Sequence, residues 1–168
     1  MVDVAELKET AVLRARGRLF EDFEEGQVFT HHWGRTITEA DAVQFSTLTL
    51  SYNPLYTNRE YAKAHGHRDL VINPLLVFNT VLGLSVEDCS EIGGPFLGVF
   101  DLVFHEPVYP GDTLTACSTT YETRVSNSNP SNGIVSWATE GRNQHDRLAV
   151  SFKRSNLVRL RTPIKMEA

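Results

Sequence analysis

One segment, residues 73–84, constrains the fold more than any other part of the sequence. It begins with Asn73 and Pro74 and continues Leu-Leu-Val-Phe-Asn-Thr-Val-Leu-Gly-Leu, so a helix here is apolar at nearly every position. Asn is a favoured N-cap, and Pro suits the first helical position because the N–H that it lacks would have no partner there. A helix of this kind is predicted to be buried on most sides. Gly83 within it is costly, which indicates close approach to another backbone.

Shorter helices are predicted before this segment. Thr38 and Asp41 form a capping-box pattern, which predicts a helix start followed by Ala42, Val43 and Phe45. Residues 58–64 are predicted to form a second short helix.

Strand patterns dominate the sequence after about Pro95. Turn signals at residues 110–112 and 144–147 separate alternating segments, and Trp137 is expected to anchor the core. The predicted strands cover residues 97–109, 113–123, 134–140 and 148–157, with an earlier strand near 28–36. Helices followed by a run of strands indicate the α+β class, and the expected fold is a curved antiparallel sheet wrapped around the long helix.

Length and charge limit the functions open to this chain. The 168 residues fit a single domain, and the net charge of −5 argues against a nucleic-acid partner. The first six residues are too charged for a signal peptide, and no apolar run is long enough to span a bilayer. We therefore expect a cytoplasmic protein with no membrane association.

A metal site is not expected. Residues 65–69 read His-Gly-His-Arg-Asp, a spacing found in some metallohydrolases, but no second ligand cluster follows. A polar loop leading into the helix cap is the preferred interpretation. The pair His31 and His32 is expected to be surface or packing, and Cys89 and Cys117 show no disulfide or metal pattern.

Four further stretches carry a resemblance to a known family. They are residues 20–27, 36–41, 53–55 and 104–114, and the likeness covers about residues 19–158 of one domain spanning 1–168. They resemble the MaoC-like hotdog family of (R)-specific enoyl-CoA hydratases and dehydratases. The resemblance implies a hotdog fold, a CoA-thioester substrate, no separate cofactor, and a homodimer or larger even-numbered oligomer with sites at the dimer interface.

Three other stretches make the sequence look closest to one branch of this family. They are residues 33–36 (Trp-Gly-Arg-Thr), 86–88 (Val-Glu-Asp) and 126–135. This branch handles mesaconyl-CoA and related branched C4–C5 dicarboxylic thioesters, so mesaconyl- or itaconyl-CoA-like substrates are the expectation.

Hydration of an enoyl thioester needs a base for water, a proton for the α-carbon and a donor for the thioester oxygen. In the family, an Asp and a His five residues apart act on the water, and a backbone N–H at the start of the buried helix holds the oxygen. Here the Asp position falls on Ser51 and the His position on Tyr56, while Asn53-Pro54 matches the family's Asn-Pro. The family's His-Gly falls on Asn73-Pro74, and Pro has no N–H to donate.

Substitute groups are nevertheless present in the sequence. The Leu75 N–H, one position further on, is a candidate oxyanion donor, and the Asn73 side chain is a second one that is expected to be used as the helix cap. Ser51 and Tyr56 can orient a water, and His67 or Asp69 can supply a base. The candidate catalytic residues are therefore Ser51, Asn53, Tyr56 and His67, with Asn73 and Leu75 binding the thioester.

Two alternatives to a hydro-lyase remain open. One is a non-catalytic acyl-CoA-binding subunit that pairs with a chain carrying the Asp and the His. The other is a hotdog thioesterase, which would place a carboxylate early in the buried helix. Residues 75–84 contain no carboxylate, which counts against the thioesterase.

Overall fold

The computed structural model describes residues 16–162, so the expectation about the first six residues lies outside the described part. Twelve elements are present within it: η1 (Phe20–Asp22), β1 (Val28–Thr30), β2 (Arg35–Thr36), α2 (Glu39–Leu48), η2 (Pro54–Tyr56), α3 (Arg59–Ala64), α4 (Pro74–Leu84), α5 (Val86–Cys89), β3 (Phe96–Phe104), β4 (Thr113–Val125), β5 (Asn132–Arg142) and β6 (Leu148–Arg159). None of the helices within residues 16–162 is long and apolar enough to cross a membrane.

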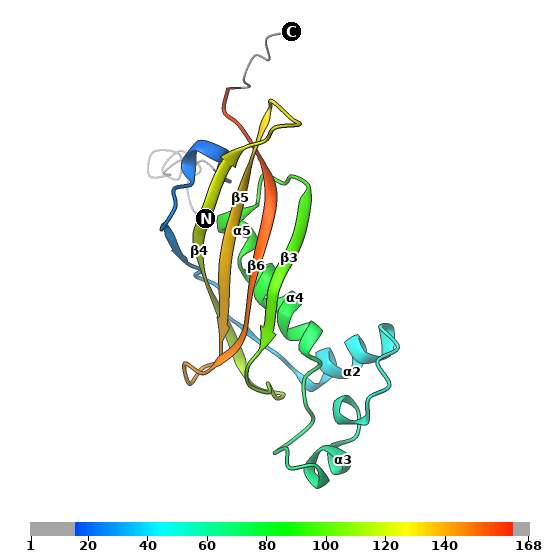
Figure 1. Ribbon diagram of the computed structural model, residues 1–168. Coiled ribbons are helices and arrows are strands. Elements are labelled where there is room, and N and C mark those ends of the chain that lie inside the picture. Colours follow the sequence, from blue (N-terminus) through cyan, green and yellow to red (C-terminus); the bar gives the residue numbers. More distant parts are fainter. Residues whose placement is uncertain (1–15, 163–168) are drawn as a thin grey trace, which may run out of the picture.

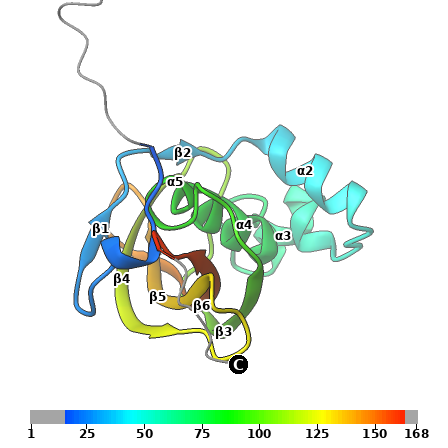
Figure 2. The ribbon, with the colours of Figure 1, turned by 90° about the horizontal axis from the view of Figure 1, so that it is seen from above.

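The strands form one antiparallel sheet in the order β1-β4-β5-β6-β3, with β2 pairing separately to β4. The sheet curves around α4 and α5, which lie in its concave side (Figure 2). The helices α2 and α3 extend beyond one end of the sheet, next to the start of α4 (Figure 1). This arrangement confirms the predicted α+β class and the sheet wrapped around one helix.

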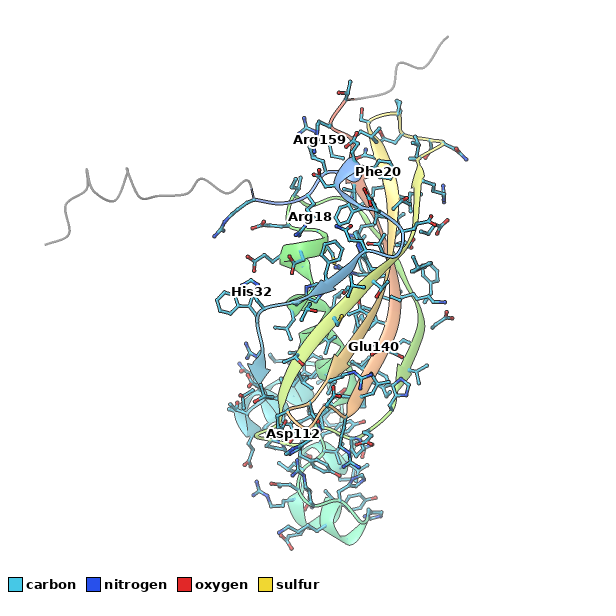
Figure 3. All side chains as sticks on the ribbon, turned by 90° about the vertical axis from the view of Figure 1, so that its left-hand side faces the viewer. Arg18, Phe20, His32, Asp112, Glu140 and Arg159 are labelled. Carbon is cyan, nitrogen blue, oxygen red and sulfur yellow. The ribbon has the colours of Figure 1, made fainter. Side chains whose placement is uncertain are left out.

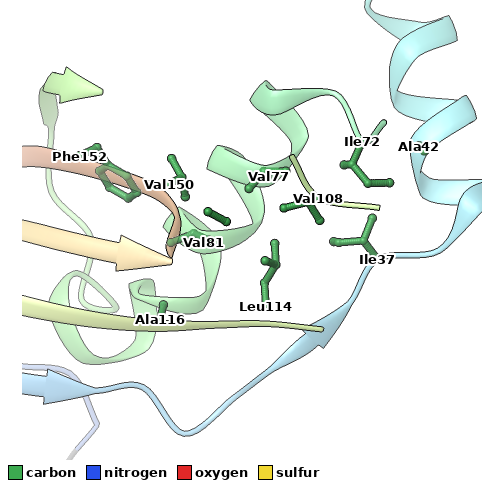
Figure 4. Packing of buried hydrophobic residues seen from close by; sticks show 11 residues of the cluster. Ile37, Ala42, Ile72, Val77, Val81, Val108, Leu114, Ala116, Val150 and Phe152 are labelled. Atoms are coloured by element: carbon green, nitrogen blue, oxygen red, sulfur yellow. The ribbon is translucent and has the colours of Figure 1, made fainter. Parts of the chain in front are cut away.

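The helix α4 begins as the sequence predicted. Asn73 is its N-cap and Pro74 its first residue. Val77 and Val81 are buried against the sheet, where they meet Val150 from β6 (Figure 4). At the start of the helix, the same apolar cluster includes Ile72 from the segment before α4 and Val108 from the loop after β3.

The prediction that α4 is buried on most sides is wrong. Leu75 is 50% exposed, and Asn79 and Gly83, which follow at intervals of four, are exposed as well. Residues spaced by four lie on one face of a helix, so a whole face of α4 is uncovered. The sheet of this chain reaches around only one side of the helix.

The close backbone approach predicted at Gly83 is not found, and the glycine at which α4 meets the sheet closely is a different one. No described atom lies within 4 Å of the position that a Cβ on Gly83 would take. A Cβ on Gly141 of β5, by contrast, would collide with a side-chain methyl group of Val81 and would lie 2.9 Å from a methyl group of Val150. It is therefore Gly141, on the sheet, that lets α4 pack closely.

The local predictions elsewhere were largely confirmed. Thr38 and Asp41 form a capping box at the start of α2, and Trp137 is completely buried. The strand predicted over residues 97–109 ends at Phe104, before Pro107, and the strand near 28–36 is broken into β1 and β2. The short helix α5 was not predicted.

Candidate active site

A short segment, residues 71–73, leads into α4 and lies between η2 and the loop that follows β3. The Val71 N–H donates to the Leu55 carbonyl at 3.0 Å, which fixes η2 on one side. The Ile72 N–H donates to the Val108 carbonyl at 2.9 Å, which fixes the loop after β3 on the other side. Figure 4 shows Ile72 and Val108 close together at the start of α4. The tip of the helix therefore lies between η2 and the 105–108 loop.

The N–H groups in the first turn of α4 are already bonded within the chain. The Asn73 side-chain oxygen accepts from the Leu75 N–H at 3.0 Å. The Asn73 carbonyl accepts from the N–H groups of Leu76 and Val77 at 2.9 and 3.2 Å. The expectation that the Leu75 N–H is a free oxyanion donor is therefore not met, because Pro74 has no N–H and the cap oxygen bonds the next one.

The amide nitrogen of Asn73 is the polar donor that remains at this helix tip. The residue is 3% exposed, and within residues 16–162 its Nδ2 has no hydrogen-bond partner. This nitrogen is not among the completely buried atoms that lack a partner, so it is open to a water or a ligand that accepts from it. The positive end of the helix dipole lies at the same place.

A cavity of about 190 Å³ lies against the first turn of α4. One wall is made by Val71, Ile72, Pro74 and Val77, and the opposite wall by residues 104–108 with Ala149. At the roughly 30 Å³ that a water molecule occupies in the liquid, this volume holds on the order of six non-hydrogen atoms. The cavity is mainly apolar and suits a short acyl group.

A second, polar pocket of about 390 Å³ adjoins this cavity, and the two share Glu106 and Pro107 as lining residues. The other residues that line the polar pocket are Gly66, Arg68, Tyr109, Asp112, Asn143, His145 and Arg147. Figure 3 places Asp112 at the end of the sheet that faces α2 and α3.

Asp112 organises the floor of the polar pocket. Its carboxylate accepts from Arg68 at 2.7 Å, from Gln144 at 2.9 Å and from the Tyr109 N–H at 2.9 Å. Burial acts to raise the pKa of Asp112, but these hydrogen bonds outweigh burial and hold the pKa below its ordinary value. The carboxylate is therefore ionised at neutral pH and fixes the 109–112 turn.

The residues predicted to act on water lie on the η2 side of the helix tip. Asn53 caps η2, because its side-chain oxygen accepts from the Leu55 N–H at 3.1 Å. The Ser51 hydroxyl lies 3.2 Å from that of Thr49. The half-buried Tyr56 makes no side-chain hydrogen bond within residues 16–162. None of these three residues lines the apolar cavity.

His67 lies closer to the polar pocket than to the cavity. Its Nδ1 is 3.1 Å from the Tyr109 hydroxyl, and Tyr109 in turn carries the Arg68 guanidinium over its ring at 4.5 Å. His67 does not line the apolar cavity. The structure therefore does not bring His67, Tyr56 and Asn73 together around one cavity within this chain.

One buried polar group was missed by the sequence analysis. His31, expected to be surface or packing without a partner, is buried and lies 2.8 Å from Asp88 and 2.9 Å from the Ser118 hydroxyl. Burial lowers the pKa of His31, and the hydrogen bond and charge of Asp88 only partly oppose this. The neutral imidazole links α5 to the sheet through partners 57 and 87 residues away.

No group of three or more potential metal ligands is found within residues 16–162. The polar loop at residues 65–69 lies within this range. His65 bonds the Tyr61 carbonyl at 2.8 Å, and Asp69 is paired with Arg59 at 2.6 Å. That ion pair, with its hydrogen bond, lowers the pKa of Asp69, so this carboxylate is held as a partner of Arg59.

The sequence matches a known family over nearly its whole length. The profile described as mesaconyl-CoA hydratase matches residues 3–168. The mesaconyl-CoA hydratase of Haloarcula marismortui is 37% identical over 158 residues, which cover 94% of this chain and 44% of that protein. The β-methylmalyl-CoA dehydratase of Chloroflexus aurantiacus is 36% identical over 147 residues, covering 88% of this chain and 42% of that protein. The chain thus spans less than half the length of these relatives.

Solved structures show the same fold. A MaoC domain protein dehydratase from Chloroflexus aurantiacus superposes with a TM-score of 0.85 at 33% identity, covering 94% of this chain and 45% of that one. The Mycobacterium tuberculosis protein RV0216, described as a double hotdog fold, superposes with a TM-score of 0.77 at 23% identity over 93% of this chain and 48% of that one. The architecture of the chain is therefore the predicted hotdog fold.

Proposed function

The chain belongs to the mesaconyl-CoA hydratase family of MaoC-like hotdog proteins, and from this membership and the geometry at α4 we propose that it is part of a hydro-lyase. The proposed reaction adds water to an enoyl-CoA thioester or removes it from a hydroxyacyl-CoA. Because the chain spans only 44% of the Haloarcula relative, the activity of that whole protein is carried over as a proposal only.

The observation that carries the proposal is the apolar cavity against the first turn of α4, which is lined by Ile72 and Pro74, the two neighbours of Asn73, and not by Asn73 itself. A thioester carbonyl that reaches the tip of α4 meets the unpartnered Asn73 Nδ2 and the positive end of the helix dipole. Charge that develops on the carbonyl oxygen during hydration is stabilised there. This assigns to the Asn73 side chain the role that a backbone N–H has in the family, and leaves Ser51, Asn53 and Tyr56 as candidate groups on the other side of the tip.

A short, branched acyl group is the proposed substrate class. The cavity volume of about 190 Å³ suits four or five carbons better than a long chain. Mesaconyl-CoA and β-methylmalyl-CoA, for which the relatives are named, have five-carbon acyl groups. We include mesaconyl-, itaconyl- and methylmalyl-type thioesters in the proposal, with no separate cofactor.

A second candidate function is a non-catalytic acyl-CoA-binding unit of a larger hydratase. Two observations favour it. Ser51 and Tyr56 replace the usual Asp and His, and the Haloarcula relative contains further sequence, since the match covers only 44% of it. In this case a partner hotdog supplies the base while this chain holds the thioester.

The two functions are separated by one assay on the purified 168-residue chain. Mesaconyl-CoA, itaconyl-CoA and crotonyl-CoA are added, and the loss of enoyl absorbance is followed together with calorimetric binding of butyryl-CoA, which has no double bond to hydrate. Turnover supports the hydro-lyase. Binding without turnover supports the second function, and neither binding nor turnover contradicts both.

We propose that two copies of the chain associate through β3. This strand lies at one edge of the sheet, and its exposed apolar residues are Phe96, Leu97, Phe100, Val103 and Phe104. An uncovered apolar edge strand favours pairing with a second copy, so we propose a homodimer or a larger even-numbered oligomer. A single domain over residues 1–168 and a cytoplasmic location belong to the same proposal.

A further inference from the structure

Glu106 is a carboxylate at the apolar cavity that the family's known chemistry does not explain. It lines both the cavity at the first turn of α4 and the adjoining polar pocket, so it lies where the two meet. The cavity wall that α4 and the segment before it form is made only of apolar residues, namely Val71, Ile72, Pro74 and Val77. A cavity of about 190 Å³ is roughly 7 Å across if it is compact, so a group at its mouth is near the helix tip.

The other titratable residue that lines the cavity, His105, turns its side chain away from it. Its Nε2 lies 2.8 Å from the Ser151 hydroxyl. Val150 and Phe152, the neighbours of Ser151, are buried in the cluster that contacts α4. Because side chains alternate along a strand, Ser151 and the imidazole that it holds are on the opposite face of the sheet.

Arg147 fixes the position of the Glu106 carboxylate. The Arg147 Nε lies 3.1 Å from a Glu106 oxygen, and the Arg147 N–H donates to the Asn143 side chain at 3.1 Å within the turn between β5 and β6. Nearby, the Ile72–Val108 hydrogen bond anchors the loop that carries Glu106 to the segment preceding α4. Arg147 thus holds the carboxylate, and the backbone bond fixes the loop that carries it.

We infer that Glu106 is the base that activates water in this chain, an inference that rests on the proposed hydro-lyase function. It takes over the work of the Asp and His that Ser51 and Tyr56 replace, from the opposite side of the helix tip.

The proposed step conserves atoms and charge. The Glu106 carboxylate takes a proton from water while the water oxygen bonds to the β-carbon. The electron pair of the double bond moves onto the thioester oxygen, which the Asn73 Nδ2 stabilises. The protonated Glu106 then returns its proton to the α-carbon, so one water has been added and the carboxylate is restored.

The test compares Glu106→Gln with the matched control Glu140→Gln in hydration of mesaconyl-CoA. Glu140 pairs with Arg142 at 2.9 Å, much as Glu106 does with Arg147 at 3.1 Å, but it lies on β5 and does not line the cavity. Glu106→Gln is expected to lower kcat by at least about 10²-fold, the usual contribution of a general base, with KM and butyryl-CoA binding nearly unchanged. Glu106→Asp is expected to recover part of the rate, and Glu140→Gln to match the wild type.

Several outcomes overturn the inference. Wild-type turnover in Glu106→Gln, or loss of turnover in Tyr56→Phe but not in Glu106→Gln, places the base elsewhere while leaving the hydro-lyase function intact. Binding of butyryl-CoA without any wild-type turnover shows that the chain lacks its own base and supports the second function. Loss of both binding and turnover in the wild type refutes the proposed function itself.

Discussion

The side-chain oxygen of Asn73 accepts a hydrogen bond from the Leu75 N–H at 3.0 Å, which leaves the Nδ2 of the same amide as the donor at the tip of α4. The oxygen of this side chain therefore caps the helix, while its nitrogen carries the proposed contact to the thioester. A substitution that keeps the oxygen and removes the nitrogen tests that proposed contact.

Asn73→Asp is such a substitution. The carboxylate still accepts from the Leu75 N–H at the positive end of the helix dipole, which offsets the cost of burying a charge, so the free energy of unfolding is expected to fall by no more than the about 1 kcal/mol lost in Asn73→Ala. Both variants are expected to lose about 10²–10³-fold in kcat, the usual effect of removing an oxyanion donor. Urea unfolding and hydration of mesaconyl-CoA provide the two measurements, and full activity in Asn73→Asp would contradict the assigned role.

Two glycines, one on β5 against α4 and one on the uncovered face of α4, should respond in opposite directions. Gly141→Ala places a methyl group against Val81 and Val150, so a loss of about 1–3 kcal/mol in the free energy of unfolding is expected. Gly83→Ala meets no described atom and improves helix propensity, which should add about 0.5–1 kcal/mol. Urea unfolding of both variants measures the difference, and the reverse order would mean that α4 packs differently.

Stability should fall as the pH drops below the ordinary His31 pKa of 6.5. Because burial lowers the pKa of His31 in the folded chain, the unfolded chain binds more protons in this range, and stability decreases from that value downward. His31→Gln is expected to flatten the dependence of unfolding free energy on pH between about pH 7.5 and pH 5.5. The exposed His145→Gln serves as control, and an unchanged slope in His31→Gln would show that His31 is not the titrating group.

The apolar edge at β3 predicts a specific effect on assembly. Phe100→Glu places a charge on this edge, where Phe100 is 52% exposed, and should shift the protein to half of its wild-type mass in light scattering. Val28→Glu is the matched control, because Val28 is 60% exposed on β1 at the opposite edge of the sheet. Equal masses for wild type and Phe100→Glu would remove β3 from the interface.

Features set by neighbouring residues were predictable from the sequence. The cap at Asn73-Pro74 and the capping box of Thr38 and Asp41 depend on a few adjacent positions, and both formed as expected. Family motifs also located the residues on either side of the helix tip.

Features that depend on distant partners were not predictable. Asp88 and Ser118, which hold His31, are 57 and 87 residues away in sequence, and no local pattern connects them. Glu106 could not be singled out from the sequence for the same reason, since Arg147 and the cavity that it lines are brought to it only by the fold. The sequence predicts that Asn73 caps the helix but not which N–H its oxygen bonds, and in the structure that N–H belongs to Leu75.

The most direct test of the Asn73 site is the infrared carbonyl band of bound butyryl-CoA carrying ¹³C at its thioester carbonyl. If the Asn73 Nδ2 donates to this oxygen, the band should lie at lower frequency in the wild-type complex than in the Asn73→Ala complex. The same frequency in both complexes, with butyryl-CoA bound in each, would show that Asn73 does not hold the thioester.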